Sequence, residues 1–237
     1  MKNYIIKSVS KVGSEWVEKF SLSDVSTVYE AQGKIGLLHN RLKPIIDGSF
    51  ICGPVVTAIC PAGDNLMIHA AVEVCSPGDI LVVAIIGESN AGMIGELLVS
   101  GLQKKGVKGI IIDAGTRDVD ILRKMNFPVW TKAIYSRGTY KCRPGWVNAP
   151  AVCGEYLINP GDLIMADDDG VVVVRKEDVQ SVWEKANQRM MREEEVRKKI
   201  ASGEISLDYN DLRTVLKQNN VIYYENEDHY KAENSAT

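Results

Sequence analysis

The period of the hydrophobic pattern changes twice between Gly87 and Asp120. A glycine-punctuated loop is followed by apolar residues at helical spacing, which predicts a helix with one apolar face: Ile94, Leu97, Leu98, Gly101 and Leu102. Lys104, Lys105 and Gly106 supply the cations and the glycine that end such a helix. The short apolar run 109–113 then predicts a strand buried on both faces, and it leads into a polar turn, Ala114–Asp118.

The patterns before this stretch predict two helices and a strand. The segment 20–28 indicates a helix entry with Ser21 or Ser23 as the cap. Residues 51–60 favour a strand broken by a Gly-Pro turn. Residues 65–74 have helical spacing with His69 near the apolar face, which is typical of a core or interface histidine, whereas His39 lies among polar residues and is expected at the surface.

Two Pro-Gly-Asp turns, 77–79 and 160–162, each precede an apolar run. They predict two similar strand entries within one sheet system. The acidic segment 167–170 precedes four valines and does not have the spacing of a calcium loop, so we interpret it as a tight turn between strands.

A long amphipathic helix is predicted from Asp178, with Val179, Val182, Trp183, Ala186 and Met190 on its apolar stripe. A second short amphipathic element follows Gly203, and the polar end of the chain is expected to be flexible. The interpretation is a core over residues 1–177, a helical arm over 178–225 and a tail over 226–237.

Composition narrows the class of protein. The 237 residues are 45% hydrophobic and 25% charged, as in ordinary globular proteins. The net charge is −3 and the sequence has no basic stripe, which argues against a nucleic-acid partner. Because the sequence has no long apolar span, we expect no membrane insertion and a cytoplasmic location. The five cysteines lack metal-site spacing and are expected to be reduced and mostly buried.

The polar residues of the 87–120 stretch suggest a binding site. A helix N-terminus attracts anions, and Arg117 can grip a carboxylate with two parallel hydrogen bonds. Glu96 and Asp118 are hard oxygen ligands suited to Mg²⁺ or Mn²⁺, or could act as a general acid or base. An anionic substrate with a divalent cation is one interpretation; the other is that Arg117 and Asp118 only cap a turn and Glu96 lies on a solvated helix face.

Glu96, Arg117 and Asp118 form the pattern Glu-x20-Arg-Asp behind a Gly-x-x-Gly loop at Gly92 and Gly95. This resembles the signature of the 4-hydroxy-4-methyl-2-oxoglutarate/4-carboxy-4-hydroxy-2-oxoadipate aldolases, whose wider family includes regulators of ribonuclease E activity. The similarity covers most of residues 20–213, through segments that include 105–118, 127–130, 159–162, 166–174 and 203–208.

The resemblance implies a β/β/α swivelling-domain fold of the α/β class with a C-terminal helical arm. It also implies Mg²⁺- or Mn²⁺-dependent cleavage of a 4-hydroxy-2-oxo polycarboxylic acid to pyruvate and a second 2-oxo acid, with oxaloacetate decarboxylation as a side activity. By resemblance, Asp118 anchors the metal, Arg117 binds the pyruvyl group and stabilises the enolate, and Glu96 orders a water for proton transfer. Glu96 stands where the family often has aspartate. The substrate-binding positions are Gly95, Leu97, Leu98 and Arg117.

The family also assembles as trimers or dimers of trimers, with an acid from the C-terminal helix of a neighbouring chain completing each site. Glu193 is the best match to that acid, and Glu194 is close behind. Further donors for the substrate's second carboxylate are available in a loop: Arg137, Lys141 and Arg143.

The alternative function is a non-catalytic regulator that binds an RNA-processing ribonuclease. Such relatives tend to lack the acid before Arg-Asp and the long arm, and this sequence has both. A methyltransferase activity finds no support, because the chain has no glycine-rich loop arranged for a nucleoside cofactor.

Overall fold

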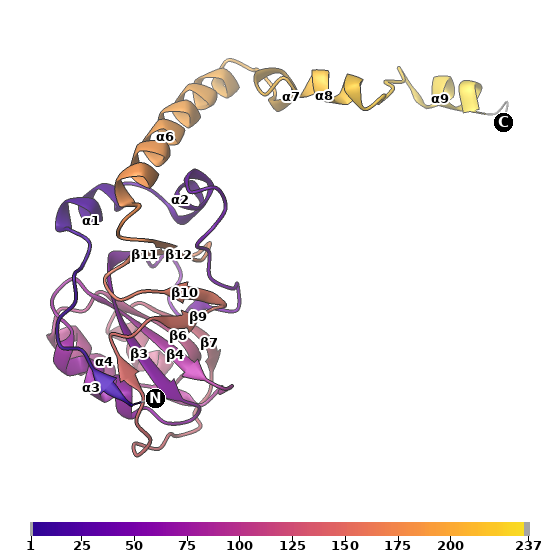
Figure 1. The fold of residues 1–237 in the computed structure, drawn as a ribbon. Helices are drawn as coiled ribbons and strands as arrows, with labels where there is room; N and C mark the ends of the chain where they lie inside the picture. The colour runs from indigo at the N-terminus through magenta and orange to yellow at the C-terminus, as the bar shows by residue number, and fades with distance from the viewer. Residues whose placement is uncertain (1, 235–237) are drawn as a thin grey trace. The chain divides into compact units, whose positions relative to one another are not determined.

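A computed structural model describes residues 2–234 (Figure 1). The chain divides into two compact units, residues 1–189 and 190–237. The first unit runs through β1 (Tyr4–Ile5), α1 (Ser14–Phe20), α2 (Val25–Ala31), β2 (Lys43–Pro44), β3 (Ile51–Pro61), α3 (Leu66–Val74), β4 (Ile80–Ile86), β5 (Gly92–Ile94), α4 (Glu96–Lys104), β6 (Gly109–Thr116), α5 (Val119–Lys124) and β7 (Val129–Ile134). It continues through β8 (Trp146–Val147), β9 (Ala151–Cys153), β10 (Tyr156–Ile158), β11 (Leu163–Ala166), β12 (Val171–Val174) and the start of α6 (Val179–Ala201). The second unit holds the rest of α6 and α7 (Ser206–Tyr209), α8 (Leu212–Gln218) and α9 (Glu227–Asn234).

The main sheet has the order β1-β8-β3-β4-β6-β7-β2, and its neighbours β3, β4, β6 and β7 run parallel (Figure 1). One face packs against α3, α4 and α5 through alternate residues such as Val56, Val83 and Ile112. The opposite face packs against a layer of short strands, β9 to β12, through residues such as Val82 and Ile111. These three layers are the β/β/α architecture of the α/β class that the resemblance implied.

The two Pro-Gly-Asp turns confirm the prediction of similar strand entries, because β4 and β11 both pair with β3. Each turn buries its aspartate. Asp79 accepts a hydrogen bond from the backbone N–H of Ser76, and Asp162 accepts one from the N–H of Asn159. The tight turn predicted at 167–170 is also confirmed, since it joins the antiparallel strands β11 and β12 and Asp167 accepts hydrogen bonds inside it.

The predicted break in the strand at Gly53-Pro54 is wrong, because β3 is continuous. Its partner changes at this point: residues 51–54 pair with β11, and residues from Val55 onward pair with β4. Proline, which lacks an N–H donor, therefore falls where the strand exchanges partners. Gly53 is needed there because a Cβ would overlap with the carbonyl oxygen of Gly78.

The helix caps differ from the predictions. Asp24 caps α2, accepting a hydrogen bond of 2.7 Å from the N–H of Thr27, whereas Ser21 ends α1 and Ser23 does not cap either helix. The segment expected to be a flexible tail contains α9, at whose start Asn226 accepts a hydrogen bond from the N–H of His229, and its flexibility stays a prediction. Residues 235–237 of that segment lie outside the described residues.

The remaining structural expectations concern cysteines and membranes. Four cysteines are buried and Cys142 is exposed, and none forms a disulfide, as expected. Among residues 2–234, no helix combines the length and the apolar character needed to cross a membrane.

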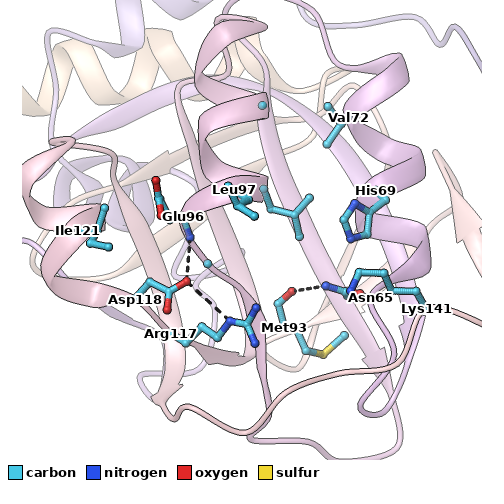
Figure 2. A pocket seen from close by; sticks show the side chains of 13 residues that line it. Asn65, His69, Val72, Met93, Glu96, Leu97, Arg117, Asp118, Ile121 and Lys141 are labelled. Atoms are coloured by element: carbon cyan, nitrogen blue, oxygen red, sulfur yellow. Dashed lines mark hydrogen bonds and ion pairs between the residues drawn. The ribbon is translucent and has the colours of Figure 1, made fainter.

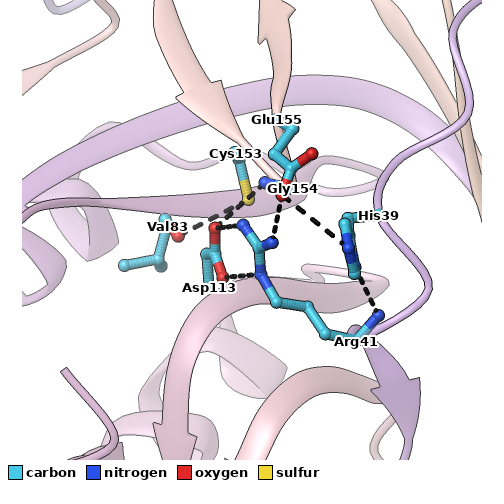
Figure 3. Close-up of polar contacts among 7 residues, drawn as sticks. All are labelled: His39, Arg41, Val83, Asp113, Cys153, Gly154 and Glu155. Carbon is cyan, nitrogen blue, oxygen red and sulfur yellow. Dashed lines mark hydrogen bonds and ion pairs between the residues drawn. The ribbon is translucent and has the colours of Figure 1, made fainter. Parts of the chain in front are cut away.

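An ion-paired cluster fastens the β9–β10 turn to β6 (Figure 3). Arg41 donates two hydrogen bonds, of 2.9 and 2.8 Å, to the carboxylate of Asp113, and its third nitrogen lies 2.6 Å from Glu155. The N–H of Gly154 also donates to Asp113. Burial raises the pKa of Asp113, but the hydrogen bonds from Arg41 and Gly154 lower it by more, so the net pKa is below its ordinary value.

We expect Arg41→Met to lower the free energy of unfolding by about 1.5–3 kcal/mol at pH 7, because it leaves a largely buried carboxylate without its charged donor. A carboxylate with a lowered pKa stabilises the fold above its unfolded pKa of about 3.9, and this contribution disappears as the pH falls through the still lower folded value. The difference between the variant and the wild type should therefore narrow below about pH 4. Urea unfolding at pH 7 and below pH 4 measures the free energy of unfolding of the variant and the wild type. Arg175→Met, at an exposed arginine, is the control. Equal stabilities of Arg41→Met and the wild type at pH 7 would show that the cluster contributes nothing to stability.

Candidate active site

A pocket of about 470 Å³ lies beyond the carboxyl ends of the parallel strands. The segments after β3, β4, β6 and β7 all contribute to it, as expected for a ligand site in an open parallel sheet. Most of the residues that line it come from α3, from the first turns of α4 and from the turn after β6: Asn65, His69, Val72, Met93, Gly95, Glu96, Leu97, Leu98, Gly101, Arg117, Asp118, Ile121 and Lys141.

The turn after β6 brings Arg117 and Asp118 to the N-terminus of α4. Asp118 has a left-handed backbone conformation (φ 59°), which aspartate tolerates better than most residues, and it precedes α5 directly. Its Oδ2 accepts a hydrogen bond of 3.1 Å from the N–H of Glu96 and lies 3.7 Å from Nε of Arg117. Both side chains remain substantially exposed to the pocket, so ligands can reach them.

The first turn of α4 offers donors to an anion. Gly95 is the N-cap and forms no side-chain cap, and the N–H groups of Leu97 and Leu98 make no hydrogen bond with any described residue. A helix N-terminus with free N–H groups favours negative charge. The arrangement can therefore hold a carboxylate between Arg117 and the start of α4.

Gly95 is required for this close approach. A Cβ at Gly95 would overlap with Oδ2 of Asp118 and lie 3.1 Å from Nε of Arg117. The glycine therefore lets the helix N-terminus, the carboxylate and the guanidinium meet.

We expect Gly95→Ala to lower kcat by about 10²-fold, because the new methyl group displaces the Asp118 carboxylate by a distance comparable to 1 Å. Ser100→Ala in the same helix is the control, since Ser100 is exposed and does not line the pocket. Steady-state kinetics of both variants, with circular dichroism to verify folding, measure the effect; similar small losses in both would show that the close approach at Gly95 does not matter for activity.

The face of α4 was partly mispredicted. Val99 and Leu102 are the buried residues of this helix, whereas Leu97 is 85% exposed. The first turn of α4 borders the pocket, so Leu97 has no packing partner there. The consequence is that Leu97 contributes its backbone N–H and an apolar side chain to the pocket.

The carboxylates of the pocket are suited to Mg²⁺. Glu96 and Asp118 both line it, and Oδ1 of Asp118 makes no hydrogen bond within residues 2–234. The described residues contain no cluster of three or more histidine, cysteine, aspartate or glutamate side chains able to hold a metal. Mg²⁺ binds through one or two carboxylates and keeps several waters, so this pair fits it.

Three residues of the opposite wall carry polar groups: Asn65, His69 and Lys141 (Figure 2). Sequence reasoning assigned Asn65 no role and regarded His69 as a core or interface residue. His69 is exposed at the pocket, which excludes the core alternative and leaves the interface one as a prediction, and its pKa is lowered by partial burial and by the positive charge of Lys141. Lys141 was predicted as a donor and lines the pocket, whereas the signal that could have found Asn65 and His69 is their position after β3, at the same sheet edge as Arg117.

The other predicted site residues lie elsewhere. Arg137 and Arg143 line a separate pocket of about 350 Å³ with Glu88. Glu193 and Glu194 are on α6 in the unit formed by residues 190–237, where both lie within ion-pair distance of Arg197. That one of them completes a neighbouring subunit's site stays a prediction.

Fold and pocket together define an α/β protein with a polar pocket at the carboxyl ends of its parallel strands, lined by Arg117, Asp118 and the N-terminus of α4. The family model described as RraA-like, Aldolase/RraA, matches residues 21–173. The chain belongs to this family.

Individual relatives agree with that assignment. A protein of Halalkalibacterium halodurans, provisionally named a 4-hydroxy-4-methyl-2-oxoglutarate aldolase, is 27% identical over 186 residues, which are 78% of this chain and 89% of that protein. Streptomyces coelicolor RraAS2, described as an unusual member of the RNase ES inhibitor RraA family, has a TM-score of 0.72 at 27% identity over 80% of this chain and 99% of its own. An uncharacterised Pseudomonas syringae protein shares the fold, with a TM-score of 0.73 at 20% identity over 83% of this chain and 97% of its own.

Proposed function

We propose that this protein catalyses the divalent-metal-dependent retro-aldol cleavage of a 4-hydroxy-2-oxo polycarboxylic acid to pyruvate and a second 2-oxo acid. The observation that carries the proposal is the meeting of Arg117, Asp118 and the open N-terminus of α4 in one pocket. The names of aldolase relatives, such as the Halalkalibacterium protein, support a lyase. Substrates of the 4-hydroxy-4-methyl-2-oxoglutarate or 4-carboxy-4-hydroxy-2-oxoadipate type fit the proposal.

In the proposed mechanism the pyruvyl carboxylate binds between Arg117 and the N–H groups of Leu97 and Leu98. Loss of the proton from the 4-hydroxyl group forms the carbonyl of the second 2-oxo acid as the bond between C3 and C4 breaks. The electron pair of that bond stays on the pyruvyl half as an enolate, which the guanidinium stabilises, and C3 then takes up a proton to give pyruvate. Asp118 and Glu96 would hold Mg²⁺ or Mn²⁺, and the ion would supply Lewis-acid stabilisation of the charge on the 2-oxo oxygen. Glu96 lies within the same pocket and is proposed to assist proton transfer through a water.

The same enolate would form when oxaloacetate loses carbon dioxide. Oxaloacetate decarboxylation is therefore proposed as a side activity of this site. We further propose that the active protein is a homotrimer or a dimer of trimers, with Glu193 or Glu194 of one chain serving the site of the next.

The experiment that tests this function is coupled detection of pyruvate with lactate dehydrogenase. A panel of 4-hydroxy-2-oxo acids and oxaloacetate is assayed with Mg²⁺, with Mn²⁺ and with EDTA. We expect pyruvate from at least one polycarboxylic substrate, no activity in EDTA, and recovery with either ion. Full activity in EDTA, or trapping of substrate on a lysine by borohydride, would exclude the metal aldolase.

The second candidate is a regulator that binds a ribonuclease. It is favoured by the likeness to RraAS2, which at 27% identity extends beyond the fold alone. A protein that releases no pyruvate from any substrate of the panel but inhibits a ribonuclease E-type enzyme would support this alternative.

A further inference from the structure

A second pocket opens at the same edge of the sheet as the candidate active site and shares none of its lining residues. Its volume is about 350 Å³, within the range of about 300–1,000 Å³ that is typical of small-molecule sites. Its walls come from the segments that follow β3, β4 and β7. Ligands of open parallel sheets bind at this edge, and the proposed aldolase mechanism uses none of the side chains of this pocket.

Glu88 and Arg137 bring opposite charges into the second pocket. Both residues are exposed, and neither side chain forms a hydrogen bond or an ion pair with any residue in the range 2–234. The two charges therefore line one pocket without neutralising each other. A small molecule that carries a cation and an anion a few bonds apart could pair with both.

The third charge of the pocket, on Arg143, already has partners. Its Nη2 donates to the carbonyl oxygen of Ala62, and its Nε lies 3.8 Å from Oδ2 of the buried Asp64. Burial raises the pKa of Asp64, but hydrogen bonds from backbone N–H groups lower it by more, so its net pKa is below the ordinary value. Asp64 is therefore ionised at neutral pH and offsets the charge of Arg143. One positive and one negative charge are left for a ligand.

Backbone hydrogen bonds connect the walls of the pocket. The N–H of Gly92, four residues after Glu88, donates to the carbonyl oxygen of Arg137 at 2.9 Å. The N–H of Tyr140 donates to the carbonyl oxygen of Gly63, also at 2.9 Å. The segments after β3 and β4 are thus both attached to the segment after β7. A site whose walls are connected in this way loses little conformational entropy when a ligand binds.

Two tyrosines add aromatic surface to the same pocket. The side chains of Tyr135 and Tyr140 line it and are 49% and 73% exposed. Exposed aromatic rings in a pocket favour contact with an apolar or aromatic group of a ligand. The lining therefore matches a molecule with both charges at one end and an apolar group at the other.

We propose that the second pocket binds a free α-amino acid with an apolar or aromatic side chain. The guanidinium of Arg137 binds the α-carboxylate, and the carboxylate of Glu88 binds the α-ammonium group. The rings of Tyr135 and Tyr140 contact the side chain of the amino acid. This site is independent of the proposed aldolase function, because the two pockets have no lining residue in common.

Calorimetric titration of the wild-type protein with three related compounds tests the proposal. L-Phenylalanine has both charged groups, 3-phenylpropanoate lacks the ammonium group, and 2-phenylethylamine lacks the carboxylate. We expect L-phenylalanine to bind at least about 10-fold more tightly than either analogue, because each analogue leaves one charge of the pocket without its partner.

Two variants assign the charged groups. Glu88→Gln should weaken the binding of L-phenylalanine by about 10–100-fold and abolish its advantage over 3-phenylpropanoate, since the partner of the ammonium group is lost. Arg137→Met should weaken it by a similar factor and abolish its advantage over 2-phenylethylamine, since the partner of the carboxylate is lost. Arg175→Met, at an exposed arginine outside both pockets, is the control and should bind L-phenylalanine as the wild type does. Circular dichroism verifies that all variants are folded.

Three results would overturn the proposal. The first is that neither L-phenylalanine nor L-leucine binds the wild-type protein at millimolar concentration. The second is binding that both Glu88→Gln and Arg137→Met leave unchanged. The third is loss of binding in Arg117→Ala, which would place the amino acid in the active-site pocket instead. Wild-type protein that binds L-phenylalanine as described but releases no pyruvate would support this site and count against the aldolase function alone.

Discussion

Replacing Arg117 by alanine is expected to lower kcat for retro-aldol cleavage by about 10²–10³-fold, or roughly 3–4 kcal/mol of transition-state stabilisation. The guanidinium lies beside Asp118 at the N-terminus of α4, where both the pyruvyl carboxylate and the enolate charge would be held. The enolate forms only during the reaction. Loss of the guanidinium that stabilises it must therefore lower kcat as well as raise KM. Steady-state kinetics with a dicarboxylic substrate measures both constants.

Arg117→Lys should also be severely impaired, since lysine lacks the planar pair of donors. Decarboxylation of oxaloacetate should fall in parallel, because it shares the enolate. Arg175→Ala, which alters an exposed arginine between β12 and α6, serves as the control for loss of positive charge. If Arg117→Ala raises KM alone, the residue only binds substrate, and if both constants are unchanged it only caps the turn.

Replacing Asp118 by asparagine is expected to remove Mg²⁺ binding and to lower kcat by at least about 10²-fold, since a bound ion contributes several kcal/mol of charge stabilisation. Asparagine has nearly the same shape and can still accept the hydrogen bond from the N–H of Glu96, so the turn should persist. Calorimetric titration with Mg²⁺ measures binding directly, without reliance on turnover.

The matched control is Asp120→Asn, two residues further on, where the carboxylate is almost fully exposed and lies 3.8 Å from Arg123. This variant should bind Mg²⁺ as the wild type does. Unchanged Mg²⁺ affinity in Asp118→Asn would remove Asp118 from the metal site.

The sequence was most informative where one local pattern determined the structure. The helix and strand predicted between Gly87 and Asp120 are present as α4 and β6, because each depends on short-range periodicity and on glycine. The turn predicted at Ala114–Asp118 is shorter than expected, since β6 continues to Thr116 and only Arg117 and Asp118 separate it from α5. The meeting of Glu96, Arg117 and Asp118 was anticipated for the same reason. The two similar strand entries after the Pro-Gly-Asp turns also followed from local turn chemistry, and both strands, β4 and β11, pair with β3.

The errors concern features that depend on distant partners. The strand β3 continues through Pro54 because β11, more than a hundred residues away in the sequence, pairs with its first half. The side chain of Leu97 is exposed because, within residues 2–234, the first turn of α4 borders the pocket and not the core. Asn65, which was assigned no role, reaches the pocket only through the order of the parallel strands, which no pattern within its own segment reveals.

The most direct test of the account is proton NMR of the pyruvate methyl group in deuterium oxide with wild-type protein. We expect the methyl signal to decay with Mg²⁺ or Mn²⁺, EDTA to stop the decay, and Arg117→Ala to stop it in the presence of metal. This outcome would show that the pocket forms the enolate from pyruvate alone. A signal that persists under every condition, or a decay that neither EDTA nor Arg117→Ala alters, would contradict the account.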